Sequence, residues 1–352
     1  MKRRYAIVPG DGIGIDVTRE AVKVLTAAAS AEGLELELTE YDYGAERFLR
    51  TGETLPPGAL DDFRAADAVF MGAFGDPRVP DMRHAREILL GTRFALDLYV
   101  NLRPVRCLDD RLCPLRGRTA RDVDFVVFRE NTEGAYVGMG GIFKKGTPDE
   151  VAIQEDVNTR KGVERILRAA FAYAVRHGRR RVTMADKSNA LRFGHDLWQR
   201  AFAEVQADYP GIEADHLYID ALAMQLIKDP SRFDVIVTCN MFGDIVTDLG
   251  AQLQGGLGLA ASGNLHPGGS AMFEPVHGSA PKYAGTDQAN PFAAILTMAM
   301  LLDHTGSERG ARRIEDAVRA CLVAGESTRD LGGALGTAAV GDAVARRVAA
   351  GS

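Results

Sequence analysis

The sequence is poor in cysteine, and it has no long uninterrupted hydrophobic segment. The chain of 352 residues has four cysteines, namely Cys107, Cys113, Cys239 and Cys321. No two of them have the C-x-x-C spacing of metal or redox sites, so we expect free thiols in a reducing compartment. The longest nearly apolar stretch, residues 292–302, is too short to cross a bilayer.

An excess of positive charge and a secretory leader are also missing. The formal net charge is −6, which argues against nucleic acid as the main partner. Basic residues at positions 2–4 precede only four apolar or aromatic positions before Pro9, and this run is too short for a signal-peptide core. These features predict a cytoplasmic protein without a nucleic-acid or membrane partner.

The composition is that of an ordinary globular protein, with 46% hydrophobic and 26% charged residues. A chain of this length buries a large core and has room for two lobes. Strand-like and helix-like patterns alternate along residues 4–72, which predicts an α/β fold with a mainly parallel sheet.

A glycine-rich turn, residues 9–14 (PGDGIG), joins a predicted strand at 4–8 to a predicted helix at 15–31. Its spacing is G-x-G-x-G, whereas the dinucleotide fingerprint is G-x-G-x-x-G followed by an acidic residue after the next strand. We therefore interpret residues 9–14 as a tight strand-to-helix connection.

Polar side chains follow four predicted strands, which end near residues 128, 185, 219 and 238. These side chains are Arg129, Lys187, Asp220, and Asn240 with Asp244. Because parallel strands end at the same edge of a sheet, we expect the groups to share one cleft. Arginines suit a substrate with several carboxylates, and the lysine suits proton transfer.

Asp244 and Asp248 lie one turn apart on a predicted helix that follows the apolar strand 233–238. Their Cβ atoms would be roughly 5–6 Å apart, so the like charges favour a cation between them. A hard divalent cation with oxygen ligands fits this pair. The alternative is a solvated acidic helix face, which is the more common explanation of an isolated D-x-x-x-D.

Seven motifs in this order make the chain resemble the β-decarboxylating dehydrogenases, which include the isocitrate and 3-isopropylmalate enzymes. The motifs are PGDGIG, NLRP at 101–104, RENTEGAY at 129–136, Lys187 with Asn189, YIDALAMQLI at 218–227, NMFGDIVTD at 240–248 and EPVHGSAP at 274–281. The resemblance covers nearly the whole chain and is highly specific.

The resemblance implies a two-lobed α/β fold with a central cleft and a dinucleotide site that is not of the Rossmann type. Residues 1–98 and 251–352 would form the larger, cofactor-binding lobe. Residues 99–250 would form the smaller lobe, with a dimerisation arm at about 131–155. The protein would be a homodimer with shared active sites, and a higher oligomer is the alternative.

The resemblance also implies roles for single residues. Arg93, Arg103 and Arg129 would hold substrate carboxylates, with Leu89, Leu90 and Asn189 also at the substrate. Mg²⁺ or Mn²⁺ would be bound by Asp244 and Asp248, and by Asp220 from the partner subunit. Lys187, also from the partner, would act at the C2 hydroxyl, and Tyr136 would return a proton after decarboxylation.

The cofactor would be held by a loop and by Asn290. This loop consists of His277, Gly278, Ser279, Ala280, Pro281, Lys282 and Tyr283. NAD-dependent members of the family have an aspartate where Lys282 stands, and its carboxylate repels a 2′-phosphate. Lys282 with Tyr283 therefore predicts NADP, with NAD as the alternative, and Arg329 lies near further phosphate-binding positions.

The substrate is predicted to be a 3-substituted malate. Leu89 and Leu90 suit an apolar group such as the isopropyl of 3-isopropylmalate, which would place the enzyme in leucine biosynthesis. The motif at 129–136 and Arg86 leave isocitrate, homoisocitrate, D-malate and tartrate open. A non-catalytic subunit of the same family is a further alternative, although every expected metal, arginine, lysine and tyrosine position is filled.

Overall fold

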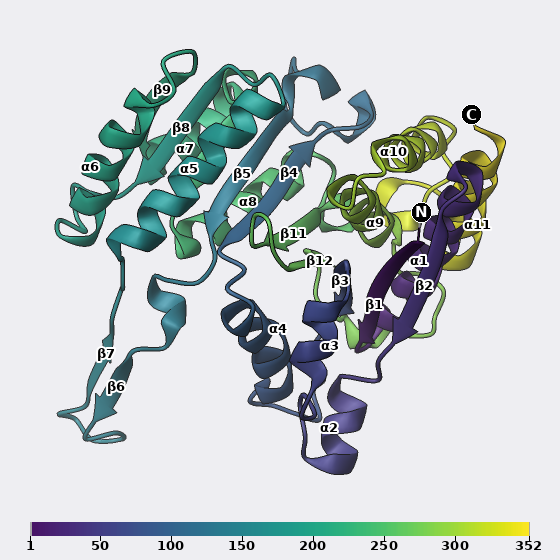
Figure 1. The fold of residues 1–352 in the computed structure, drawn as a ribbon, viewed down its shortest axis with the longest axis horizontal. Helices are drawn as coiled ribbons and strands as arrows, with labels where there is room; N and C mark the ends of the chain where they lie inside the picture. The colour runs from purple at the N-terminus through teal and green to yellow at the C-terminus, as the bar shows by residue number, and fades with distance from the viewer. Residues whose placement is uncertain (1, 352) are drawn as a thin grey trace. The chain divides into compact units, whose positions relative to one another are not determined.

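The computed structural model describes residues 2–351. The chain divides into two compact units, drawn in Figure 1. The first unit comprises Met1–Leu98, Arg106–Ala120 and Ala251–Ser352, and the second comprises Tyr99–Val105 and Arg121–Gly250. This division groups residues 106–120 with the first unit, whereas the family resemblance implies a single lobe over residues 99–250.

The first unit has a mixed sheet with the strand order β2-β1-β3-β12-β11. Its strands are β1 (Lys2–Gly10), β2 (Glu35–Glu40), β3 (Ala68–Ala73), β11 (Ala261–Leu265) and β12 (Ala271–Pro275). Strand β1 pairs in parallel with β2 and β3, while β11 and β12 are antiparallel. The sequence did not predict this hairpin, because glycine, serine and asparagine make β11 resemble a loop.

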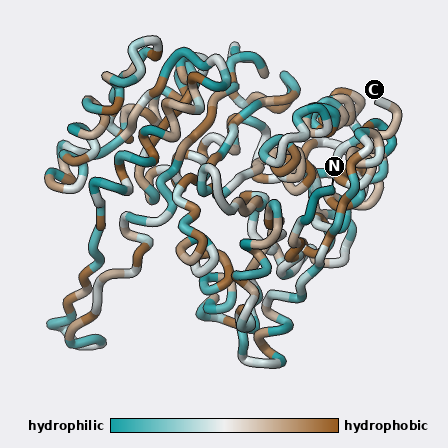
Figure 2. The backbone as a smooth tube through the Cα atoms, in the orientation of Figure 1, coloured by the Kyte–Doolittle hydropathy of each residue, from teal (hydrophilic) through white to brown (hydrophobic). Residues whose placement is uncertain are grey.

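The described residues of the first unit form seven α-helices. They are α1 (Ile13–Glu32), α2 (Ala45–Thr51), α3 (Ala59–Ala65), α4 (Arg83–Ala95), α9 (Phe292–His304), α10 (Glu308–Val323) and α11 (Thr337–Ala350). The apolar segment 292–302 is the buried helix α9, which packs against α1, α10 and β11 and is a hydrophobic stretch in Figure 2. No helix within residues 2–351 is long and apolar enough to span a membrane.

The second unit has the strand order β4-β5-β10-β8-β9. These strands are β4 (Val100–Arg106), β5 (Asp124–Glu130), β8 (Arg181–Asp186), β9 (Glu213–Tyr218) and β10 (Val235–Thr238). The helices are α5 (Arg160–Arg176), α6 (Gly194–Ala207), α7 (Ile219–Lys228) and α8 (Asn240–Leu253). Thr159 caps the start of helix α5, because its Oγ1 accepts a hydrogen bond from Gly162 N at 3.0 Å.

An antiparallel pair of strands, β6 (Gly140–Phe143) and β7 (Val151–Gln154), extends away from the other strands of the second unit (Figure 1). Gly134 and Val157 form a bridge at its base. Apolar side chains on both strands are exposed, with Phe143 at 66%. A two-stranded ribbon of this kind has no core of its own, so its apolar side chains are available for association.

Candidate active site

The carboxyl ends of four parallel strands bring the predicted polar groups of the second unit to one edge. Strand β10 pairs in parallel with β5 and with β8, so that Thr238 lies opposite both Arg129 and Ala185. Strand β8 pairs in parallel with β9, with Asp186 opposite Tyr218. The side chains after β8, β9 and β10 and the end of β5 therefore meet at this edge, as the sequence predicts.

Arg129 is the centre of the first set of contacts at this edge. Its side chain is 2% exposed, and its Nη1 lies 2.5 Å from Asp244 Oδ1. Arg129 Nε and Nη2 donate to Asn240 Oδ1 at 3.0 and 2.8 Å. A buried guanidinium needs a counter-charge and hydrogen-bond acceptors, and the first turns of α8 supply both. Gly243 is required here, because a Cβ on it would lie 2.5 Å from Arg129 Cγ.

Arg103 and Tyr136 reach the same carboxylate. Arg103 Nη2 lies 3.6 Å from Asp244 Oδ1, and its Nη1 donates to Thr247 Oγ1 at 2.6 Å. Tyr136 Oη donates to Asp244 Oδ2 at 2.7 Å. Burial of the phenol, followed by the hydrogen bond to Asp244, raises the pKa of Tyr136 above its usual value. The hydroxyl therefore keeps its proton at neutral pH, as a proton donor must.

Lys187 and Asp220 form the second set of contacts. Lys187 Nζ lies 2.9 Å from Asp220 Oδ1, and this bond lowers the pKa of Asp220. Lys187 N donates to Nδ1 of the buried His195 at 3.0 Å. Burial lowers the pKa of His195, which keeps its ring a neutral acceptor. Asn189, predicted at the substrate, is exposed in the turn after Lys187.

The acidic residues of α8 have the donor atoms that a hard dication requires. Asp244 is half-buried and Asp248 exposed, one helical turn apart. Within residues 2–351, no group of three or more His, Cys, Asp or Glu side chains forms a metal cluster. Magnesium commonly uses only one or two protein carboxylates together with substrate oxygens and water, so the pair fits such an ion.

In the first unit, the predicted substrate-binding Arg93 lies in the last turn of α4, after Leu89 and Leu90. Arg93 is 8% exposed, and its Nη2 donates to Glu274 Oε1 at 2.6 Å. The same oxygen accepts a hydrogen bond from Asn264 Nδ2 at 2.8 Å. Glu274 therefore provides the counter-charge for Arg93, a role that the sequence did not assign to it.

The predicted cofactor loop follows β12. His277 and Gly278 lead to the buried Ser279, and Ala280 has φ 36° before the 3₁₀ turn η6 (Pro281–Tyr283). Lys282 Nζ lies 4.6 Å from the centroid of the Tyr283 ring, and both side chains are exposed. Such a pair presents a positive charge and a hydroxyl group to an incoming anion.

Asn290, also predicted to bind cofactor, is buried beyond this loop and bonded on both sides. Its Oδ1 accepts a hydrogen bond from Phe292 N at 3.0 Å at the start of α9. Its Nδ2 donates to Asp330 Oδ2 at 2.9 Å. Arg329, the neighbour of Asp330, is exposed in η7 (Arg329–Leu331). Asn290 thus connects the end of the cofactor loop to the segment that carries Arg329.

The glycine-rich turn is a tight connection held against neighbouring backbone, in agreement with our interpretation. A Cβ on Gly10 would lie 2.2 Å from the Ala73 carbonyl oxygen, and one on Gly12 would lie 2.2 Å from that of Ser279. Both glycines have positive φ, 76° and 56°. Only glycine allows these close approaches.

Comparison with known proteins decides the family. A model of the isocitrate/isopropylmalate dehydrogenase family matches residues 4–344. The chain belongs to this family. The predicted family, the dehydrogenase class and the α/β fold class are therefore confirmed.

Family members with curated names and solved structures match nearly the whole chain. The 3-isopropylmalate dehydrogenases of Thermobifida fusca and Streptomyces coelicolor are 48% and 50% identical to it, over 98% of each chain. The isocitrate dehydrogenase of Methylococcus capsulatus has a TM-score of 0.90 and 39% identity over 99% of both chains. TT0538 of Thermus thermophilus has a TM-score of 0.87 and 36% identity, and the match covers 68% of that chain.

Several residues of the family motifs support the site without having been predicted to do so. Glu130 accepts hydrogen bonds from Thr132 N and Glu133 N, which shapes the turn before Tyr136. Glu133 in turn accepts from Thr159 N at the start of α5. Acidic residues in a motif next to an apolar strand were the available signal. The bonds of Glu130 lie within its own turn, whereas Thr159, the partner of Glu133, lies too far along the chain to be inferred.

Proposed function

We propose that the protein catalyses the oxidative decarboxylation of 3-isopropylmalate to 2-oxo-4-methylpentanoate and CO₂. The observation on which this rests is the 48–50% identity, over almost the full length, to proteins named 3-isopropylmalate dehydrogenase. Leu89 and Leu90, both half-buried on α4, support an apolar substituent at C3 of the malate. Burial of the isopropyl group against these side chains would remove apolar surface from water and so favour binding.

The polar residues have complementary roles in this reaction. Arg93, Arg103 and Arg129 would bind the two carboxylates of the malate, since each is a nearly buried guanidinium suited to bidentate contacts. Lys187, held by Asp220, would take the proton of the C2 hydroxyl. Tyr136, whose raised pKa keeps it protonated, would return a proton to the carbon that loses CO₂.

Asp244 and Asp248, with Asp220 of a partner subunit, would hold the divalent cation, Mg²⁺ or Mn²⁺. When bound, the cation would stabilise negative charge on the C2 oxygen and the nicotinamide would accept hydride from C2. The contacts at Asp244 support this assignment, because Arg103, Arg129 and Tyr136 all converge on this half-exposed carboxylate. Substrate carboxylates can compete for the arginines once the cation neutralises Asp244.

NADP⁺ is the proposed dinucleotide. Lys282 and Tyr283 are exposed side by side in η6 and can both meet a 2′-phosphate, and Arg329 lies next to the Asp330 that binds Asn290. Charge-assisted contacts of this kind contribute about 1.5–3 kcal/mol each, or roughly a tenfold to hundredfold preference per contact. The pair Lys282→Asp with Tyr283→Ile should reverse the preference, as measured by kcat/KM with both dinucleotides. Equal or better kcat/KM with NAD⁺ in the unmodified protein would contradict it.

The active form is proposed to be a homodimer. Exposed apolar side chains lie on β6 and β7, and Met224 on α7 and Ile245 on α8 are 71% and 62% exposed. Such side chains favour burial against a second copy of the chain. The pair Lys187 and Asp220 would then complete the site of the partner subunit.

The proposed reaction is tested by dinucleotide reduction in the presence of Mn²⁺ with a panel of substrates. The panel comprises 3-isopropylmalate, isocitrate, homoisocitrate, D-malate and tartrate. We expect the highest kcat/KM with 3-isopropylmalate. A higher value with isocitrate would favour the second candidate, which the exposed Arg86 on α4 and the Lys282–Tyr283 pair support. No turnover with any substrate would favour a non-catalytic family member.

A further inference from the structure

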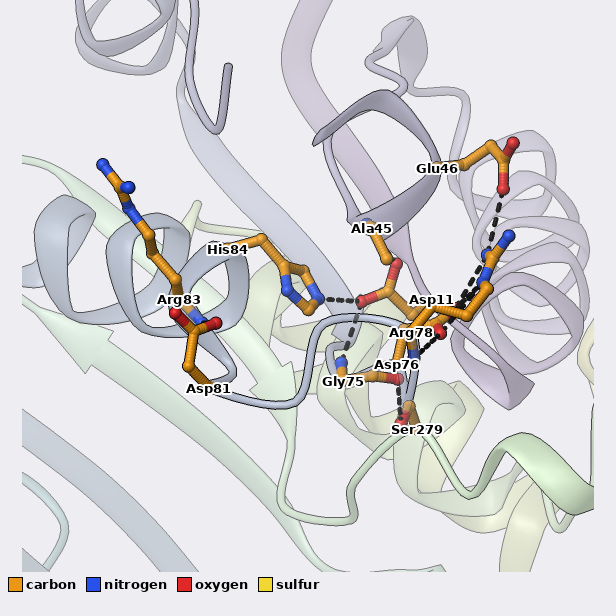
Figure 3. Close-up of polar contacts among 10 residues, drawn as sticks. All are labelled: Asp11, Ala45, Glu46, Gly75, Asp76, Arg78, Asp81, Arg83, His84 and Ser279. Carbon is orange, nitrogen blue, oxygen red and sulfur yellow. Dashed lines mark hydrogen bonds and ion pairs between the residues drawn. The ribbon is translucent and has the colours of Figure 1, made fainter. Parts of the chain in front are cut away.

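Asp11, in the glycine-rich turn, binds three segments that are distant in the sequence (Figure 3). Its Oδ1 accepts a hydrogen bond from Ala45 N at 2.6 Å. Its Oδ2 accepts one from Gly75 N at 2.8 Å and one from His84 Nε2 at 2.9 Å. Asp11 is 5% exposed and His84 is fully buried. A carboxylate removed from water in this way is stable only because these donors satisfy it.

The three donors belong to different segments of the first unit. Ala45 is the first residue of α2, and Gly75 lies just after β3. His84 lies in the first turn of α4, the helix that carries Leu89, Leu90 and Arg93 further along. Asp11 therefore ties the first turn of the proposed substrate-binding helix to the glycine-rich turn.

Gly75 connects Asp11 to the cofactor loop, because it is hydrogen-bonded to both Asp11 and Ser279. Ser279 Oγ donates to the Gly75 carbonyl oxygen at 2.6 Å, and Ile13 N donates to that of Ser279 at 2.8 Å. A Cβ on Gly75 would lie 3.0 Å from Ser279 Oγ and 2.7 Å from Met82 Cε. Ser279 is thus held between the Gly75 turn and the glycine-rich turn. Asp11 is part of the glycine-rich turn and accepts a hydrogen bond from Gly75 N.

His84 takes part through one ring nitrogen. Nε2 donates to Asp11, whereas Nδ1 has no hydrogen-bond partner among residues 2–351. A glutamine at this position can place an amide N–H where Nε2 stands, and a leucine cannot donate at all. Position 84 therefore allows a direct comparison of a retained and a lost donor.

We infer that Asp11 and His84 are positioning residues for dinucleotide binding, which hold Ser279 and the start of α4 in the arrangement that binds ligand. The inference rests on the proposed role of the Ser279 loop in cofactor binding. Neither residue needs to touch the dinucleotide. Rigid support of this kind matters because small displacements of a binding group strongly weaken its contacts.

The main test compares Asp11→Asn with the unmodified full-length protein. Ala45 N and Gly75 N bind different oxygens of the carboxylate, and in the amide one of these positions becomes an NH₂ group that cannot accept a hydrogen bond. We expect amide hydrogen exchange in segments 73–76 and 277–283 to become about tenfold faster, and the Kd for NADP⁺, measured by calorimetry, to rise about tenfold. Glu20→Gln is the matched control, because Glu20 is an equally buried carboxylate in α1 whose side-chain partners are Arg19 and Lys23.

The position 84 variants separate positioning from a general loss of stability. His84→Leu should reproduce both effects of Asp11→Asn, and His84→Gln should restore exchange and NADP⁺ affinity to near the unmodified values. They also decide the question if Asp11→Asn does not fold. Unchanged exchange and unchanged Kd in His84→Leu, in a protein that binds NADP⁺, would overturn the inference. If the unmodified protein binds no dinucleotide, the proposed cofactor use fails, and unchanged exchange in His84→Leu would separately exclude the positioning role.

Discussion

Asp11 of the first unit and the acidic residues of the proposed site in the second unit have opposite environments. In the first unit, Asp11 is 5% exposed and has three donors. In the second unit, the side chains of Asp220 and Asp244 are 64% and 39% exposed, and Asp248 is also exposed. Carboxylates that are completely bonded inside the chain maintain its architecture, whereas carboxylates that remain accessible at a strand edge are available to ligands.

Replacement of an accessible acidic residue of the proposed cation site should lower activity strongly and leave stability unchanged. We expect Asp248→Asn to lower kcat about 100-fold or more through weaker cation binding, with unfolding free energy changed by less than about 0.5 kcal/mol. Asp303→Asn, an exposed change on α9, is the control and should change neither quantity. Calorimetry with Mn²⁺ provides the direct measurement. If the Mn²⁺ affinity of Asp248→Asn is unaltered, Asp248 is not a cation ligand and belongs to a solvated helix face.

The accessible pair Lys187 and Asp220 should act in the partner subunit. Lys187→Ala and Asp244→Asn chains, each inactive alone, should regain about a quarter of normal activity after random re-association, because half of the dimers would be mixed and one of their two sites would be intact. Activity is measured before and after the chains are unfolded together and refolded. If the refolded mixture is no more active than either variant alone, the site is not shared between subunits.

Changes in the glycine-rich turn should act mainly on stability. Gly12→Ala combines a positive φ with a contact of 2.2 Å to the Ser279 carbonyl oxygen, and we expect a loss of about 1–3 kcal/mol. Gly33→Ala isolates the backbone term, because Gly33 has φ 64° and no atom within 4 Å of the added Cβ. Calorimetric unfolding should show the greater loss for Gly12→Ala. Equal losses of unfolding free energy in the two variants would mean that the close contact of Gly12 with Ser279 adds no cost.

The smallest expected effect concerns Tyr136. Burial and the bond to Asp244 raise the pKa of its phenol, so the folded state favours the protonated form. The resulting stabilisation is present below the ordinary tyrosine pKa and is lost as pH rises through the raised value. Ultraviolet difference titration against Tyr136→Phe should show ionisation above the usual range. Asp244→Asn should bring it closer to the ordinary value, and an unchanged titration would exclude Asp244 as a cause.

Local patterns in the sequence determined much of the site. The polar residues after β8, β9 and β10, and Arg129 at the end of β5, were assigned to one edge because parallel strands must end together. The glycine spacing of residues 9–14 was enough to reject a dinucleotide fingerprint. The motifs and their order identified the family.

Only the tertiary structure decided which residues that are distant in the sequence form hydrogen bonds and ion pairs with each other. Glu274 meets Arg93 across 181 positions, and Asp11 meets His84 across 73. The hairpin of β11 and β12 is likewise stabilised by pairing and burial rather than by the β-propensity of its residues. Hydrogen bonds and ion pairs depend on distance in space, and a sequence without its fold specifies only distance along the chain.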